Sequence, residues 1–89
     1  NEAVILDVRE PAEFSAGHIA RARSVPLGKL AERIGELEKF KNRTLVVCCA
    51  SGHRSSAACA LLKKSGFTQV AQLKGGFAAW QQAGMPVDK

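Results

Sequence analysis

Short apolar runs alternate with amphipathic segments along this chain, and turn-forming residues separate them. The runs at 3–6, 44–48 and 69–73 are typical of strands, and the run at 3–6 has the composition of a strand buried on both faces. Between 27 and 40, apolar residues spaced three and four apart form one face of an amphipathic helix. The remaining predicted elements are helices from Pro11 to Gly17, from Ser55 to about Ser65 and from Gly76 to Gly84, and a brief strand at Ser24–Pro26.

This alternation predicts an α/β fold with a mostly parallel central sheet of four to five strands and helices on both faces. The 89 residues suffice for a single domain, which we expect to span 1–89. In parallel sheets of this kind, ligands bind beyond the carboxyl ends of the strands. The segment after Cys48, which ends the most apolar strand, is therefore the expected site.

Composition limits the partners and the compartment. The net charge of +5 comes from scattered Lys and Arg, and Tyr is absent, so we expect no nucleic-acid partner. No apolar run reaches the roughly 18 residues of a membrane span. The odd count of three cysteines favours reduced thiols over a disulfide framework. We expect a cytoplasmic location, or a periplasmic one if a signal segment has been removed.

Cys49 is the predicted nucleophile, because it stands where the strand ends and a short polar loop leads into a helix. Backbone amides from Ala50 onward can surround its sulfur, and Gly52 permits a backbone angle that other residues avoid. Arg54, together with His53, adds positive charge beside the start of the helix. These effects lower a thiol pKa and favour the reactive thiolate. The alternative is a buried structural cysteine.

Three segments resemble the signatures of one family. The run 49–55 is similar to the active-site loop of rhodaneses, which are sulfurtransferases. The run 6–10, followed by Glu13-Phe14 and Gly17-His18-Ile19, resembles the first signature of that family, and 73–80 followed by 84–87 resembles its last. The resemblance implies a single three-layer rhodanese domain over 1–89, lacking part of the N-terminal strand and helix of the usual domain.

The resemblance also implies a mechanism. The thiolate of Cys49 attacks the outer sulfur of thiosulfate or a related donor, and the resulting persulfide passes its sulfur to a thiol, cyanide or a protein acceptor. This makes the chain an enzyme, a thiosulfate sulfurtransferase, which needs no metal or other cofactor and acts as a monomer or weak dimer. The alternative is a sulfur-carrier module of a larger protein. The residues expected to bind the donor and the persulfide are Ala50, Ser51, Gly52, His53, Arg54 and Ser55.

The double cysteine leaves a second alternative open. Four residues separate Cys49 from Arg54, which is the rhodanese loop length, whereas five separate Cys48 from Arg54. The longer spacing resembles cysteine-dependent phosphatases, whose wider loop holds a phosphate. Such a phosphatase usually has His before its nucleophile, and Val47 stands there instead. We therefore favour Cys49 and interpret Cys48 as a small buried side chain.

Several charged and polar residues have two interpretations. Arg54 either binds the anionic end of the donor or forms a salt bridge to Asp7 or Glu13 that braces the loop. Asp7 lies at the end of the first strand and is expected to orient either the loop or Arg9. Asp7 and Arg9 are therefore predicted to be supporting residues of the site. Ser55 either donates a hydrogen bond to the persulfide or caps the helix that starts there.

Overall fold

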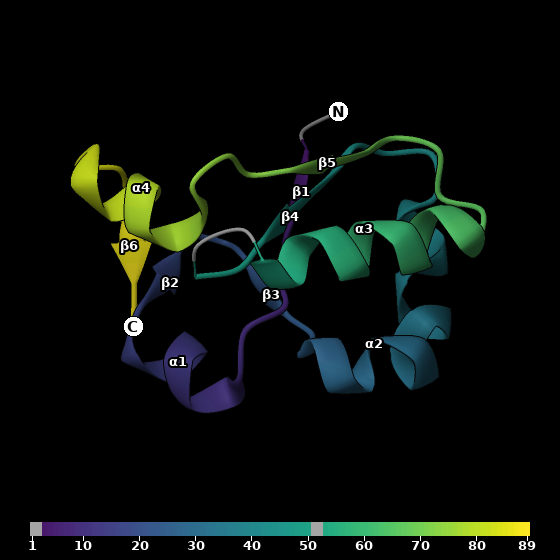
Figure 1. Ribbon diagram of the computed structural model, residues 1–89, viewed down its shortest axis with the longest axis horizontal. Coiled ribbons are helices and arrows are strands. Elements are labelled where there is room, and N and C mark those ends of the chain that lie inside the picture. Colours follow the sequence, from purple (N-terminus) through teal and green to yellow (C-terminus); the bar gives the residue numbers. More distant parts are fainter. Residues whose placement is uncertain (1–2, 51–52) are drawn as a thin grey trace.

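Four parallel strands form the centre of the fold (Figure 1), in a computed structural model that describes residues 3–50 and 53–89. In spatial order the strands are β3 (Arg23–Ser24), β1 (Val4–Asp7), β4 (Leu45–Cys48) and β5 (Val70–Gln72). The two central strands pair in register from Val4 opposite Leu45 to Asp7 opposite Cys48. Their carboxyl ends therefore place Asp7 beside Cys48 at one edge of the sheet.

Helices cover both faces of the sheet, as the sequence predicts. The helices are α1 (Pro11–Ala16), α2 (Leu27–Arg33), the 3₁₀ helix η1 (Ile34–Phe40), α3 (His53–Lys64) and α4 (Gly76–Gln82). On one face, Leu30 of α2 and Leu62 of α3 pack with Leu6 and Val47 of the central strands. On the other face, Phe77 of α4 packs in a smaller cluster. Figure 1 shows α4 well apart from the pair formed by α2 and α3.

Two local differences separate the structure from the expected elements. The helix predicted over 27–40 divides, because α2 ends at Arg33 and the chain continues as η1. Arg33 leaves helical geometry, with φ of −104° and ψ of 9°, just before Gly35, a residue that weakens α-helices. A second, two-stranded antiparallel sheet joins β2 (His18–Ile19) to β6 (Val87–Asp88). Among the described residues, every helix is too short or too polar to cross a membrane.

Candidate active site

The expected nucleophile stands directly after β4, as predicted, and it is buried. Cys49 is only 1% exposed and belongs to the main core cluster. Ala50 follows it, and α3 begins at His53. Ser51 and Gly52 of the expected cradle lie outside the described residues. The structure therefore places Cys49 where a central strand meets the loop before a helix, at the carboxyl edge of the sheet.

Cys48 points to the opposite face of the sheet from Cys49, because successive side chains of a strand alternate. It packs with Ile19 and Phe77, and its Sγ lies 3.5 Å from the carbonyl oxygen of Cys49. Burial, followed by the nearby charge of Asp7, raises the pKa of the Cys48 thiol to about 12. A thiol with that pKa stays protonated near neutral pH, which argues against Cys48 as a nucleophile.

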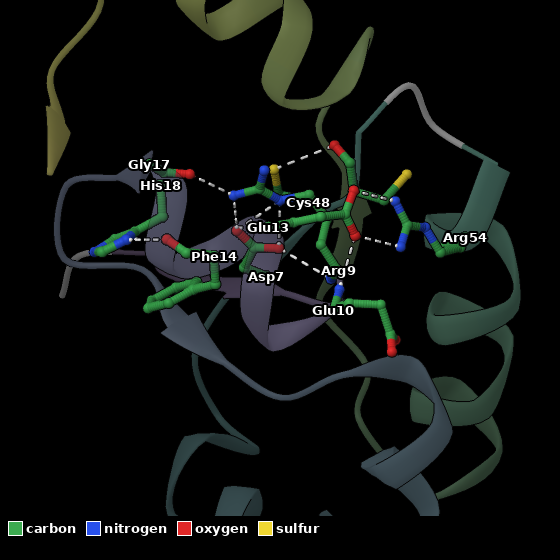
Figure 2. A network of polar contacts seen from close by, with 10 residues as sticks. Asp7, Arg9, Glu10, Glu13, Phe14, Gly17, His18, Cys48 and Arg54 are labelled. Atoms are coloured by element: carbon green, nitrogen blue, oxygen red, sulfur yellow. Dashed lines mark hydrogen bonds and ion pairs between the residues drawn. The ribbon is translucent and has the colours of Figure 1, made fainter. Parts of the chain in front are cut away.

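Arg54 forms a bidentate ion pair with Glu13, a residue of α1 (Figure 2). Its Nη1 and Nη2 atoms lie 2.8 and 3.1 Å from the two carboxylate oxygens of Glu13. Of the two roles expected for Arg54, donor binding and a salt bridge that braces the loop, the structure shows the salt bridge. Its partner is Glu13 and not Asp7. The pair ties the first turn of α3 to α1, so it holds the far end of the loop that follows Cys49.

Glu13 is fixed by a second contact. Its Oε1 accepts a hydrogen bond of 2.9 Å from the backbone N–H of Glu10, the residue that precedes α1. The hydrogen bond from Arg54, together with this backbone hydrogen bond, lowers the pKa of Glu13 to about 2. Glu13 is therefore ionised at any physiological pH, and it offsets the charge of Arg54 at the rim of the site.

Asp7 and Arg9 form a buried ion pair beside Cys48. The carboxylate of Asp7 accepts hydrogen bonds from Nε of Arg9 at 2.9 and 3.0 Å and from Nη2 at 2.7 Å. Nη2 also donates to the carbonyl oxygen of Gly17 at 2.8 Å, and the guanidinium lies 4.2 Å from the ring centre of Phe77. Asp7 thus orients Arg9, one of the two roles expected for it, and Figure 2 shows this pair with the hydrogen bond to Gly17. The contact of Arg9 with the Phe77 ring joins the pair to α4.

Two further side chains complete the description of the loop region. Ser55 lies in the first turn of α3, fully buried, and its Oγ has no hydrogen-bond partner among the described residues. Its hydroxyl therefore does not cap α3 within the described part of the chain, and its O–H group can donate a hydrogen bond to another acceptor. Cys59 lies in the main core cluster, and burial raises the pKa of its thiol.

One set of contacts at the site is not predictable from the residue pattern. The backbone N–H groups of Phe77 and Ala78, at the start of α4, donate to the carbonyl oxygens of Cys49 and Ala50 at 2.8 and 3.2 Å. The signal available in the sequence was the pair Gly75-Gly76, which allows a chain to turn tightly and approach another backbone closely. The sequence pattern predicts this pair as the lead-in to the last helix and as part of a family signature, without indicating a contact with the Cys49 loop.

Comparisons with known proteins give one consistent result. The family described as rhodanese-like domain matches residues 1–83. The chain is similar to a sulfurtransferase of Allochromatium vinosum, with 37% identity over 97% of this chain and 78% of that protein. It is also similar to the thiosulfate sulfurtransferase GlpE of Stutzerimonas stutzeri, with 38% identity over 89% of this chain and 71% of that protein.

Other relatives are longer than this chain. The chain spans 61% of the uncharacterized protein YqhL of Bacillus subtilis, at 42% identity, and 49% of the uncharacterized protein slr1261 of a Synechocystis species, at 43% identity. Among solved structures, the rhodanese-like domain of the Anabaena protein Alr3790 superposes with a TM-score of 0.90 at 36% identity, covering 99% of this chain and all of that one. The match over nearly the whole length, in sequence and in fold, shows that this chain belongs to the family of rhodanese-like domains.

Proposed function

We propose that this chain is a sulfurtransferase that carries sulfane sulfur as a persulfide on Cys49. The observation that carries the proposal is the position of Cys49, directly after a central strand and before a loop whose far end is held by the Arg54–Glu13 pair. The names of the similar proteins, a sulfurtransferase and a thiosulfate sulfurtransferase, support the same chemistry. Cys48, with a pKa of about 12, is unsuited to the role.

The proposed reaction has two balanced steps. The thiolate of Cys49 attacks the outer sulfur of thiosulfate, a new S–S bond forms, and the old S–S bond breaks as sulfite leaves with its electron pair. An acceptor nucleophile, such as cyanide or a thiolate, then attacks the terminal sulfur of the persulfide. That second attack releases the Cys49 thiolate with its electron pair and restores the starting state.

Within this proposal, backbone amides of the loop from Ala50 to Arg54 stabilise the persulfide anion. Ser55 is expected to help, because its buried hydroxyl has no acceptor among the described residues and a hydrogen bond to sulfur would satisfy it. Arg54 contributes mainly by holding the loop, since Glu13 already offsets its charge. Arg54 therefore offers little net positive charge to a dianionic donor, and thiosulfate as the donor is part of the proposal.

The test is sulfur transfer from thiosulfate to cyanide by the native chain and by the variants Cys48→Ser and Cys49→Ser. The intact mass of each protein is measured after exposure to thiosulfate alone. We expect Cys49→Ser to lose both the activity and the added mass of one sulfur atom, while Cys48→Ser keeps both. Sulfur bound by Cys49→Ser, or activity lost only in Cys48→Ser, would refute the assignment of Cys49.

A second candidate is a sulfur-relay module within a larger protein. The observation that favours it is the length of the relatives, because the chain spans only 21% of a probable adenylyltransferase/sulfurtransferase, MoeZ, of Mycobacterium tuberculosis, at 35% identity. A relay module would form the persulfide yet pass it slowly to small acceptors. The module is favoured over the free-standing enzyme if the persulfide forms readily from thiosulfate but its sulfur passes more slowly to cyanide than to a protein thiol.

A further inference from the structure

The first turn of α4 touches the catalytic loop from outside. The backbone N–H of Phe77 donates to the carbonyl oxygen of Cys49 at 2.8 Å, and that of Ala78 donates to the carbonyl oxygen of Ala50 at 3.2 Å. Amides in the first turn of a helix have no acceptor within the helix itself. Here the two carbonyls that follow β4 serve as their acceptors, so α4 fixes the direction of both carbonyls.

The direction of a carbonyl also sets the direction of the next amide. In a trans peptide group the C=O and the N–H point to opposite sides. Because the carbonyl of Cys49 faces α4, the N–H of Ala50 faces away from α4. Ala50 is the first residue of the proposed persulfide cradle. The direction of its N–H is therefore fixed by the hydrogen bond that the Cys49 carbonyl, in the same peptide group, accepts from Phe77.

Gly76 makes this contact possible. It is buried and has φ of 61°, a backbone conformation that residues with a side chain rarely adopt. A Cβ placed on Gly76 would overlap the carbonyl oxygen of Cys49 and lie 2.8 Å from that of Ala50. Both obstacles are backbone atoms of the loop, which cannot rotate away as a side chain can. Any side chain at Gly76 must therefore push the loop and α4 apart.

We propose that Gly76 is a positioning residue for sulfur transfer, acting through α4 on the amides of the Cys49 loop. The loop is then held at both ends, by α4 at Ala50 and by Glu13 of α1 at Arg54. This inference rests on the proposed persulfide chemistry for its effect on turnover. Its effect on the Cys49 thiol is independent of that chemistry, because aligned amides stabilise the thiolate whether or not sulfur is transferred.

The test compares Gly76→Ala with two control variants. Gly35→Ala adds the same methyl group where nothing lies within 4 Å. Trp80→Phe removes the hydrogen bond of 2.7 Å from Trp80 Nε1 to the Pro86 carbonyl, so it perturbs α4 without touching the loop. For each folded protein, two quantities are measured: the pH midpoint of Cys49 alkylation, located by peptide mass, and kcat/KM for transfer from thiosulfate to cyanide.

We expect Gly76→Ala to raise the alkylation midpoint by about one pH unit and to lower kcat/KM by about tenfold to a hundredfold. This loss is at or below the low end of the roughly hundredfold to thousandfold effect of removing one anion-stabilising donor. Both controls keep the native midpoint, although Trp80→Phe lowers the unfolding temperature. A merely structural role for Gly76 would lower stability and leave the midpoint of the folded protein unchanged, and that result overturns the inference.

If Gly76→Ala does not fold, Ala78→Pro gives the second test, because it deletes the N–H that binds Ala50 from the first turn of α4, where Pro is best tolerated. It should shift the alkylation midpoint in the same direction by a smaller amount, and a native midpoint overturns the inference. A native chain that gains no sulfur from thiosulfate overturns the proposed function instead. The alkylation measurement then still decides whether Gly76 positions the loop.

Discussion

Breaking the buried ion pair of Asp7 and Arg9 should be the most damaging small change in the site region. The substitution Asp7→Asn keeps the size of the side chain and removes its charge. Asp7 is fully buried and Arg9 is 4% exposed, so the guanidinium would be left with a neutral amide, the carbonyl of Gly17 and the ring of Phe77. Removing one partner of such a pair costs about 3–5 kcal/mol, because an uncompensated charge stays buried.

That loss is large against the stability of a domain of this size. At about 0.05–0.15 kcal/mol per residue, a chain of 89 residues has a free energy of unfolding of about 5–13 kcal/mol. The loss can be read from urea titration followed by fluorescence, because Trp80 is the sole tryptophan and packs against the smaller core cluster. The midpoint should fall steeply while the slope stays constant, as expected for lost stability without a change of compactness.

A matched control comes from the pair of Arg33 and Glu36, which has similar geometry at 3.0 Å but lies on the surface. Glu36→Gln should leave the midpoint almost unchanged, because water already solvates both groups. If Asp7→Asn fails to fold, the double variant Asp7→Asn with Arg9→Met should recover part of the stability, since no charge then remains buried. Equal midpoints for Asp7→Asn and Glu36→Gln would refute this reasoning.

Two further results are expected. Glu13→Gln should lower the free energy of unfolding by about 1 kcal/mol at pH 7, because screening limits a pair that is one-third exposed. Since the pKa of Glu13 is lowered from 4.5 to about 2, this difference from the native chain should shrink as the pH falls below 4.5 and be lost below about 2, and a gap at pH 2 as large as at pH 7 would contradict it. At pH 8, limited alkylation should modify Cys49 and spare Cys48, because the Cys48 thiol has a pKa of about 12 and stays protonated; peptide mass reports both, and labelling of Cys48 as early as Cys49 in the folded protein would contradict this difference.

The fold was predictable because periodicity and burial agree along most of the chain. Leu45, Val47 and Cys48 of the apolar run form the buried positions of β4, and the small apolar positions after His53 form α3 as expected. The break between α2 and η1 could not be placed, because a single Gly within an otherwise helical pattern weakens the helix without necessarily ending it. The two-residue strands β2 and β6 also gave no signal, since such short pairs form only when tertiary contacts bring them together.

The site was predictable in its residue types and less so in its contacts. The position of Cys49 after the strand follows from the sequence alone, because strand length and the start of the next helix bracket it. The partner of Arg54 did not follow, because Glu13 lies 41 residues away and Asp7 offered the same charge at the same edge of the sheet. Only the position of α1 in the folded chain decides which of the two carboxylates Arg54 contacts. The roles of the loop residues in sulfur transfer stay predictions.

The opposite orientation of the neighbouring cysteines has a consequence for oxidative damage. Their Cα atoms are about 3.8 Å apart across one peptide bond, closer than the roughly 4.4 Å that most disulfides require, and their side chains leave the strand on different faces. Cys48 therefore gives Cys49 no internal resolving thiol. A peroxide that reaches Cys49 should take it to a sulfenic acid, which a small external thiol such as glutathione must then reduce. Recovery of Cys49 after oxidation would depend on the thiol pool around the protein rather than on a disulfide between these two residues.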